Sequence, residues 1–184
     1  MIGAAIEAVI EVLYFLLPAY FANMAPILFK GTLHSLAKPI DGGKKWRGKE
    51  IFGSHKTWRG VLVAVLVGLL VFWIQQRLYW RYVFKALSLF NYEQMPIVLG
   101  ALLGFGAILG DLAKSFAKRR LGKPSGARWF PFDQIDYPLG AMILGSLLFV
   151  PPLQVWIIGI VLSIILSSMV NFVAHKIGLK EVQW

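Results

Sequence analysis

Three aspartates in the C-terminal half of the chain have the side chains and the spacing of a phosphate-handling site. Asp133 and Asp136 are three residues apart, so both can point the same way on a helix or turn. Asp111 ends the apolar stretch that precedes them. Carboxylates this close would repel one another, and a divalent cation removes the conflict. Because Mg²⁺ takes one or two protein carboxylates and completes its shell with water and phosphate oxygens, we expect a magnesium site here.

Cations follow Asp111 closely. Four of them fall within six residues, namely Lys118, Arg119, Arg120 and Lys123. If the helix that carries Asp111 continues, Lys114, Ser115 and Lys118 share a face with it. Arginine offers a planar fork to a phosphate, and lysine offers a point charge. Carboxylates that hold Mg²⁺ beside cations that hold phosphates are what phosphoryl chemistry needs.

The acid pair also admits a simpler explanation. Pro138 suits the first position of a helix, and we expect the fourth apolar helix to start there. Asp136 would then only cap this helix, and Asp133 would pair with a nearby arginine. The helix N-terminus would in either case favour a bound phosphate.

A second basic segment covers residues 30–60. Its glycines allow tight turns and close approach of the backbone to a ligand. Lysines and amides between these glycines could hold a polyphosphate, although no Walker-type GxxxxGK[ST] motif is present. The alternative is a solvated basic loop that only sets topology and touches anionic lipid headgroups.

The elements that position these residues are apolar helices. The chain has 184 residues, of which 58% are hydrophobic, against about 45–50% in soluble domains. Its mean hydropathy is +0.66. We therefore expect a single domain over residues 1–184, an all-α integral membrane protein with two basic cytoplasmic loops at about 30–60 and 113–137. The five predicted spans cover about 6–29, 61–74 (extending as far as 82), 96–112, 138–150 and 153–173. The fourth is short for a bilayer, so it either thins the membrane or lies inside the bundle.

The distribution of basic residues predicts the orientation. Sixteen of the nineteen lysines and arginines lie in the two loops and the C-terminal tail, which includes Lys176 and Lys180. With five spans all three segments fall on one side, and lysine and arginine gather on the cytoplasmic side. We expect the N-terminus outside, the C-terminus in the cytoplasm, and a multi-pass protein of the cell membrane. The net charge of +10 is thereby explained without nucleic-acid binding.

Small residues in the third span can bring helices close together. Gly100, Gly104, Gly106 and Gly110 form two small-xxx-small pairs. Packing within the chain is the simpler use of these pairs. A homodimer seam is the other, and the sequence does not separate them.

Three segments of the chain resemble the membrane CTP-transferase superfamily, which includes CDP-diacylglycerol synthase. They are LPAYFANMAPILF in the first span, IDGGKKWRGKEIFGSHKTWRG in the first loop, and GDLAKSFAKRRLGKPSGARWFPFDQIDYPLGA around the acid pair. Arg59 replaces the acid usual in the bacterial signature, Gln134 replaces an arginine, and FPF replaces HGG. These departures, the length and the inferred topology bring the chain closer to the archaeal branch, the CDP-archaeol synthases.

The resemblance implies a cytidylyltransferase with Mg²⁺ as cofactor. The lipid phosphate of 2,3-bis-O-geranylgeranylglycerol 1-phosphate would attack the α-phosphorus of CTP, giving an unsaturated CDP-archaeol and pyrophosphate at the cytoplasmic face. The residue roles that it implies are metal binding by Asp111, Asp133 and Asp136, catalysis by Asp133, Asp136, Lys118 and Arg119, nucleotide binding by Lys56, Thr57, Trp58, Ser115, Arg120 and Lys123, and lipid-headgroup contact by Asn23. Hydrogen bonding to a neighbouring helix is the alternative for Asn23.

Two other functions compete with this one. A small transporter subunit would place acids along a path at the bilayer midplane. An acyl-phosphate-dependent glycerol-phosphate acyltransferase would have no obvious use for the DQID acid pair and would work without nucleotide. A purely structural scaffold would explain neither the acid pair nor the glycine-rich loop.

Overall fold

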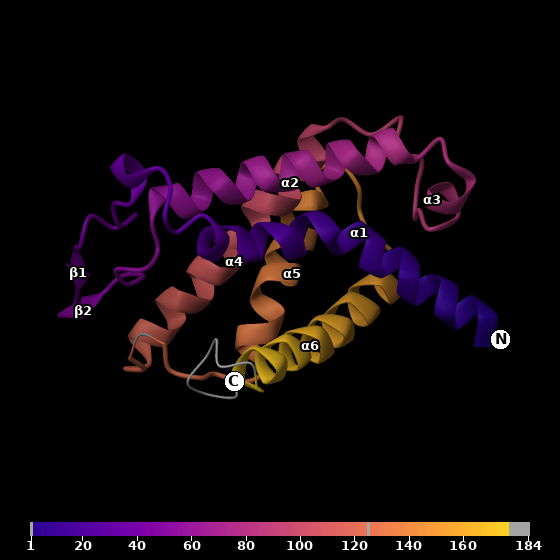
Figure 1. Cartoon of the computed structure of the whole chain (residues 1–184). Helices are drawn as coiled ribbons and strands as arrows, with labels where there is room; N and C mark the ends of the chain where they lie inside the picture. The colour runs from indigo at the N-terminus through magenta and orange to yellow at the C-terminus, as the bar shows by residue number, and fades with distance from the viewer. Residues whose placement is uncertain (1, 125, 177–184) are drawn as a thin grey trace.

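The protein is a bundle of long helices in a computed structural model that describes residues 2–124 and 126–176. Lys180 of the tail lies outside the described residues. In chain order the elements are α1 (Ile2–Leu28), the 3-10 helix η1 (His34–Leu36), β1 (Lys45–Trp46), β2 (Lys49–Glu50), α2 (Trp58–Leu78), α3 (Tyr82–Ala86), α4 (Val98–Arg120), α5 (Phe132–Gly145) and α6 (Leu153–Lys176) (Figure 1). The mostly helical class is confirmed. The small antiparallel pair β1–β2 in the first loop was not predicted.

Four helices are long and apolar enough to cross a membrane. These segments are Gly3–Leu28, Trp58–Leu78, Val98–Arg120 and Leu153–Val170. An integral membrane protein is therefore confirmed. Helix α5 has 14 residues, which corresponds to about 21 Å against a hydrocarbon core of about 30 Å. It packs along α4 and contacts α1 and α6, so it lies inside the bundle. The count of five spans stays a prediction.

The start of α5 differs from the prediction. The helix begins at Phe132 rather than at Pro138, which lies inside it. The helix therefore starts six residues earlier than expected. The Asp133 carboxylate accepts a hydrogen bond from the Trp129 N–H at 2.6 Å, which joins the first turn of the helix to the segment before it. Asp136 therefore does not cap the helix, and both aspartates lie on its first two turns.

Glycines set the distance between α4 and its two neighbours. Those at 100 and 104 face α2, and those at 106 and 110 face α5. A Cβ on Gly104 would lie 2.5 Å from the Ala64 carbonyl oxygen of α2. One on Gly110 would lie 2.0 Å from the Asp136 carbonyl oxygen of α5. Packing within the chain, the simpler of the two predicted uses, is confirmed, and it brings the helix of Asp111 against the helix of Asp136.

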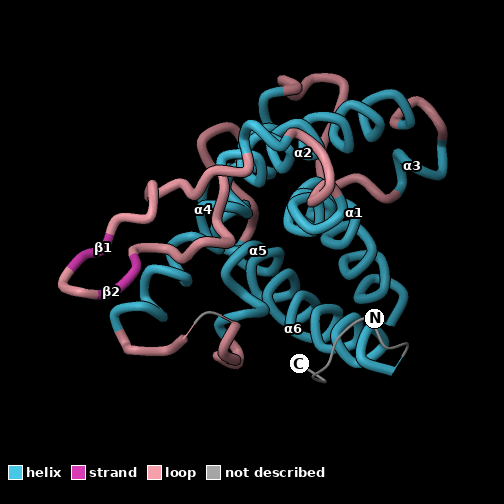
Figure 2. Tube along the Cα trace, turned by 60° about the vertical axis from the view of Figure 1, so that its left-hand side comes forward, coloured by secondary structure: helices cyan, strands magenta, loops and turns pink. Residues whose placement is uncertain are grey.

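The two ends of the bundle differ in character. At the end near α3, the fully buried Tyr92 stacks on Phe90 with ring centroids 4.4 Å apart and contacts Phe72 and Tyr14. At the other end lie the first loop, its hairpin and the C-terminal end of α4 (Figure 2). Aromatic side chains fill the first end, and the candidate site residues of the first loop and of the C-terminal part of α4 lie at the second.

Candidate active site

Lys114 lies at the centre of the three aspartates. Its Nζ is 3.1 Å from Asp111 Oδ1, 3.3 Å from Asp133 Oδ1 and 2.7 Å from Asp136 Oδ2. Its side chain is 15% exposed and that of Asp136 only 6%, so solvent screens this network weakly. The three aspartates therefore converge as the sequence predicted, around a lysine that was not among the predicted site residues.

Two further lysines close the network. Lys56, from the first loop, forms an ion pair with Asp111. Lys118, one turn beyond Lys114 on α4, lies 2.5 Å from Asp133 Oδ1 and donates to the Ala127 carbonyl oxygen at 2.6 Å. Three ammonium groups and three carboxylates thus form one continuous cluster. We call it the Asp–Lys cluster.

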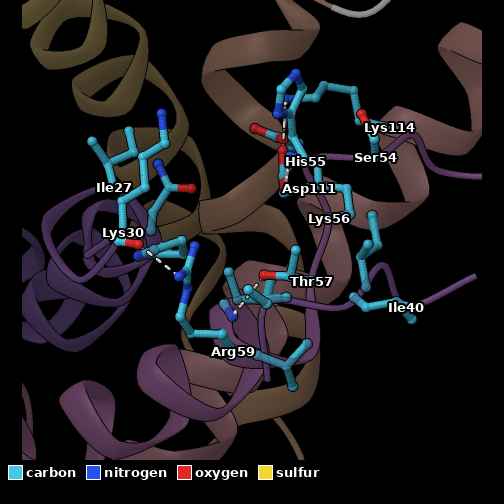
Figure 3. A pocket seen from close by; sticks show the side chains of 18 of the residues that line it. Ile27, Lys30, Ile40, Ser54, His55, Lys56, Thr57, Arg59, Asp111 and Lys114 are labelled. Atoms are coloured by element: carbon cyan, nitrogen blue, oxygen red, sulfur yellow. Dashed lines mark hydrogen bonds and ion pairs between the residues drawn. The ribbon is translucent and has the colours of Figure 1, made fainter. Parts of the chain in front are cut away.

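The Asp–Lys cluster borders a cavity of about 630 Å³ between α1, α2, α4 and the first loop. The α1 side of this first cavity is lined by Asn23, Pro26 and Ile27. Lys30, just after the end of α1, lines the cavity as well. Figure 3 shows Lys56, Asp111 and Lys114 on one side and Ile27 with Lys30 on the other. This cavity therefore joins an apolar helix end to the charged cluster.

A second cavity of about 370 Å³ lies on the other side of the cluster. Its lining comes from the first loop, α4, the loop after α4 and the start of α5. Ser115, Lys118, Arg119 and Arg128 are among its polar lining residues. The two cavities share five lining residues, which are His55, Lys56, Asp111, Lys114 and Asp133. The cluster is thus the common wall of a polar cavity and a partly apolar one.

Asp41 organises the first loop that delivers Lys56. Its carboxylate accepts hydrogen bonds from the N–H groups of Phe52 and Gly43, each at 3.0 Å, and of Gly53 at 3.4 Å. Burial alone would raise the pKa of Asp41, but these backbone donors lower it below its usual value. The Ile40 N–H also donates to the Lys56 carbonyl oxygen at 2.8 Å. The loop is folded back on itself, and this fold sets the position of Lys56.

Arg120 fastens the hairpin to the end of α4. Its guanidinium donates to the carbonyl oxygens of Trp46 and Glu50, each at 2.5 Å, and of Lys49 at 3.3 Å. The Trp46 ring in turn stacks on Phe116 of α4 with centroids 5.4 Å apart. These bonds and the ring stacking hold the hairpin against the C-terminal end of α4.

The predicted site residues divide into two groups. Those that line a cavity are Asn23, Lys56, Thr57, Asp111, Ser115, Lys118, Arg119, Asp133 and Asp136. Within the described chain, those that line neither cavity are Trp58, Arg120 and Lys123. Thr57 also caps α2, because its hydroxyl accepts the Gly60 N–H at 3.3 Å. His55, which lines both cavities, was not predicted.

The acid pair can accommodate Mg²⁺. Across residues 2–124 and 126–176, no three histidine or acidic side chains gather closely enough to form a metal site by themselves. Mg²⁺ does not require this, since water and phosphate oxygens complete its shell. The Asp136 Oδ1 atom is buried and has no hydrogen-bond partner, which leaves one carboxylate oxygen available for a cation. The donor set therefore fits magnesium held by Asp133 and Asp136 together with a nucleotide.

Apolar helices around a carboxylate and lysine cluster define a membrane enzyme that handles phosphates. Comparisons with known proteins specify it further. The sequence model of the CarS-like CDP-archaeol synthase family matches residues 5–184, and the chain belongs to this family. It is a cytidylyltransferase that forms CDP-archaeol with CTP, and the transporter and acyltransferase alternatives lose their support.

Relatives agree over nearly the whole chain. A CDP-archaeol synthase of Methanoculleus marisnigri is 40% identical, with 92% of this chain and 100% of the relative covered. One of Thermococcus gammatolerans is 36% identical, with 98% and 99% covered. A solved structure described as an intramembrane enzyme for archaeal membrane lipids biosynthesis superposes with a TM-score of 0.70 at 25% identity, covering 86% of this chain and 91% of that one. Both the fold and the family thus have independent support.

Proposed function

We propose that this cytidylyltransferase transfers CMP from CTP to 2,3-bis-O-geranylgeranyl-sn-glycerol 1-phosphate. A phosphate oxygen of the lipid attacks the α-phosphorus of CTP, the bond to the β-phosphate breaks, and pyrophosphate leaves. One observation supports this most directly. The two cavities, one partly apolar and one polar, meet at the Asp–Lys cluster.

The lining of each cavity indicates which substrate it takes. The first has the apolar Pro26 and Ile27 at a helix end and the cations Lys30 and Arg59, a combination suited to a lipid with a phosphate headgroup. Asn23 faces the same space and can donate to that headgroup. The isoprenoid chains would continue along apolar helix surfaces into the bilayer.

The second cavity suits the triphosphate of CTP. Arg119 and Lys118 present cations, Ser115 presents a hydroxyl, and each of the three is less than a tenth exposed. Buried cations bind phosphate strongly because water screens them poorly. A lipid phosphate in the first cavity would then face the α-phosphate across the shared wall.

The residues of the shared wall align and neutralise the reacting groups. Asp133 and Asp136 would hold Mg²⁺, and Asp111 would join directly or through water. When bound, the ion would neutralise phosphate charge and orient the leaving pyrophosphate. Lys118 and Arg119 stabilise charge on the phosphates as the bond to the β-phosphate breaks. Lys56 approaches from the first loop, whose position Asp41 maintains.

We infer that the chain is a single polytopic unit of the cell membrane whose site faces the cytoplasm. Helix α5 would be the fourth of five crossings, since it runs back along α4 from the site end (Figure 1). The positive-inside rule supports a cytoplasmic site, because both basic loops lie at the site end.

A label-transfer assay tests the proposed function. Purified protein would receive Mg²⁺ and CTP radiolabelled at the α-phosphate, with ether-linked or ester-linked lipid phosphates as acceptors. We expect label in the lipid product with the unsaturated ether lipid phosphate. CTP labelled at the γ-phosphate serves as the control and should release the label as pyrophosphate. Product formation from a lipid lacking the phosphate, or none from any lipid phosphate, would contradict the proposal.

A further inference from the structure

The Asp–Lys cluster is electrically balanced by the protein itself. Its acids are Asp111, Asp133 and Asp136, and its bases are Lys56, Lys114 and Lys118. Each carboxylate lies within 4.0 Å of at least one ammonium nitrogen. Lys114 alone pairs with all three. The formal charge of the cluster is therefore zero before any ligand binds.

Further cations surround this balanced cluster. Lys30 and Arg59 line the first cavity, and Arg119 and Arg128 line the second. Among the described residues, the acids that line either cavity are only those of the cluster. A free divalent cation would thus enter a positive field and meet carboxylates that are already neutralised.

A magnesium ion already bound to CTP meets the opposite situation. The triphosphate carries about four negative charges at neutral pH, so the complex keeps about two after binding one Mg²⁺. The cationic cavity attracts this anionic complex. The phosphates can also accept Lys114, whose ammonium has three donors on a flexible four-carbon stem.

We propose that Lys114 is a positioning residue that acts as a resident cation. In the nucleotide-free enzyme its ammonium holds the three carboxylates together and excludes free metal. When the nucleotide arrives with its metal, Lys114 would turn from the carboxylates to a phosphate oxygen, which would leave the carboxylates to hold that metal. Metal binding is therefore coupled to nucleotide binding. This inference rests on the proposed function, because it assumes that CTP occupies the second cavity.

Two features of the site support the exchange. Lys114 lines both cavities, so its ammonium has space on either side of the carboxylates. Asp136 Oδ1 is buried and unpaired while its Oδ2 accepts Lys114 at 2.7 Å, so one oxygen of this carboxylate is left for another cation. If Lys114 only stabilised the fold, nothing would favour leaving Asp136 Oδ1 without a hydrogen-bond partner.

Binding of Mn²⁺, followed by electron paramagnetic resonance of the unbound ion, tests the coupling without turnover. No lipid phosphate is added, so CTP is not consumed. Three Mn²⁺ affinities are compared: for protein with CTP, for protein alone and for CTP alone. We expect the first to be at least about tenfold tighter than either of the other two. In Lys114→Met the cluster carries one net negative charge, and Mn²⁺ alone should bind at least about tenfold more tightly than to wild type. Lys114→Arg keeps the charge and should behave as wild type without nucleotide.

Matched variants separate this role from general effects of charge. Lys44→Met makes the same charge change on an exposed loop position and should leave Mn²⁺ binding unchanged. Lys56→Met removes the other cation on Asp111 and should raise Mn²⁺ affinity in the same direction. If Lys114→Met does not fold, Lys56→Met and the nucleotide dependence of the wild type decide the question.

The contrary results are distinct from a failure of the proposed function. Equal Mn²⁺ affinity of wild-type protein with and without CTP would overturn the inference, as would wild-type affinity in both Lys114→Met and Lys56→Met. The same wild-type preparation is assayed for label transfer to the lipid phosphate. If label is transferred but Mn²⁺ binds tightly without nucleotide, only the role of Lys114 as a resident cation is rejected. If no label is transferred, the proposed function is rejected.

Discussion

Replacing Gly110 by alanine should disable the site from a position that touches no substrate. The new Cβ would lie 2.0 Å from the Asp136 carbonyl oxygen, where ordinary contacts begin at 3.4 Å. The atoms that this Cβ would meet are backbone atoms of α5, so no side-chain rotation relieves the clash. Helices α4 and α5 must move apart by about 1.4 Å at this point.

This displacement acts directly on the carboxylate geometry. Asp111 follows Gly110 on α4, and Asp136 carries the obstructing carbonyl on α5. A shift of that size would lengthen the contact of 2.7 Å between Lys114 Nζ and Asp136 Oδ2 to about 4 Å. Misplacement of reacting groups by about 1 Å can cost about 100-fold in rate. We expect a loss of kcat of that order, with a stability cost of about 1–3 kcal/mol.

Label transfer and thermal unfolding in detergent, measured together, check this prediction. Gly68→Ala is the matched control, because its Cβ would lie 2.5 Å from the Gly100 carbonyl oxygen at the α2–α4 contact. Gly100 lies about three helical turns before Asp111. Gly68→Ala should lower the melting temperature similarly while keeping most of the turnover. The reasoning is wrong if Gly110→Ala retains wild-type kcat, or if Gly68→Ala loses as much activity at the same melting temperature.

Three other predictions concern the acid pair, Asp41 and the two neighbouring arginines. Asp133→Asn or Asp136→Asn should abolish CMP transfer in folded protein, and chelation with EDTA should abolish it in the wild type. Restored Mg²⁺ should rescue only the chelated wild type. Turnover that persists in EDTA would reject the metal assignment. Asp41→Ala removes the acceptor of three backbone N–H groups and should raise KM for CTP more than it lowers kcat, with Asp41→Asn milder, as steady-state kinetics would show. Arg119→Met should weaken CTP binding at least about tenfold. Arg120→Met should mainly lower the melting temperature, and equal loss of CTP affinity in both variants would contradict their different placement.

Hydropathy predicted the long helices well because lipid permits few alternatives. A segment in hydrocarbon must satisfy its backbone hydrogen bonds internally, so apolar runs become helices. The boundaries were harder to predict where a local hydrogen bond lies at the helix start. Thr57 caps α2, which begins at Trp58 rather than near residue 61. Helix α5 begins ahead of Pro138, and there the Trp129 N–H donates to Asp133. Both bonds use side chains that also appeared as candidate ligands.

The site was predictable where spacing along one helix decides proximity. Asp111, Lys114, Ser115 and Lys118 were expected to share a face, and all four line the same cavity. Lys114 was given no role there, although a lysine three residues after an aspartate can meet it on a helix. The role of Asp41 was not available, because its partners at Phe52 and Gly53 are eleven and twelve residues away and approach only when the loop closes.

Neighbouring arginines show why a count of basic residues does not describe a phosphate site. Arg119 and Arg120 are consecutive, and consecutive helical residues point about 100° apart. Arg119 consequently lines the second cavity, whereas Arg120 donates to three carbonyl oxygens of the hairpin. The first arginine is therefore the one proposed to bind phosphate, and the second holds the hairpin of the first loop against α4. The hairpin is attached at the helix end through Arg120 and Trp46. One short helical segment therefore carries both the arginine that lines the second cavity and the attachment of the loop that delivers Lys56.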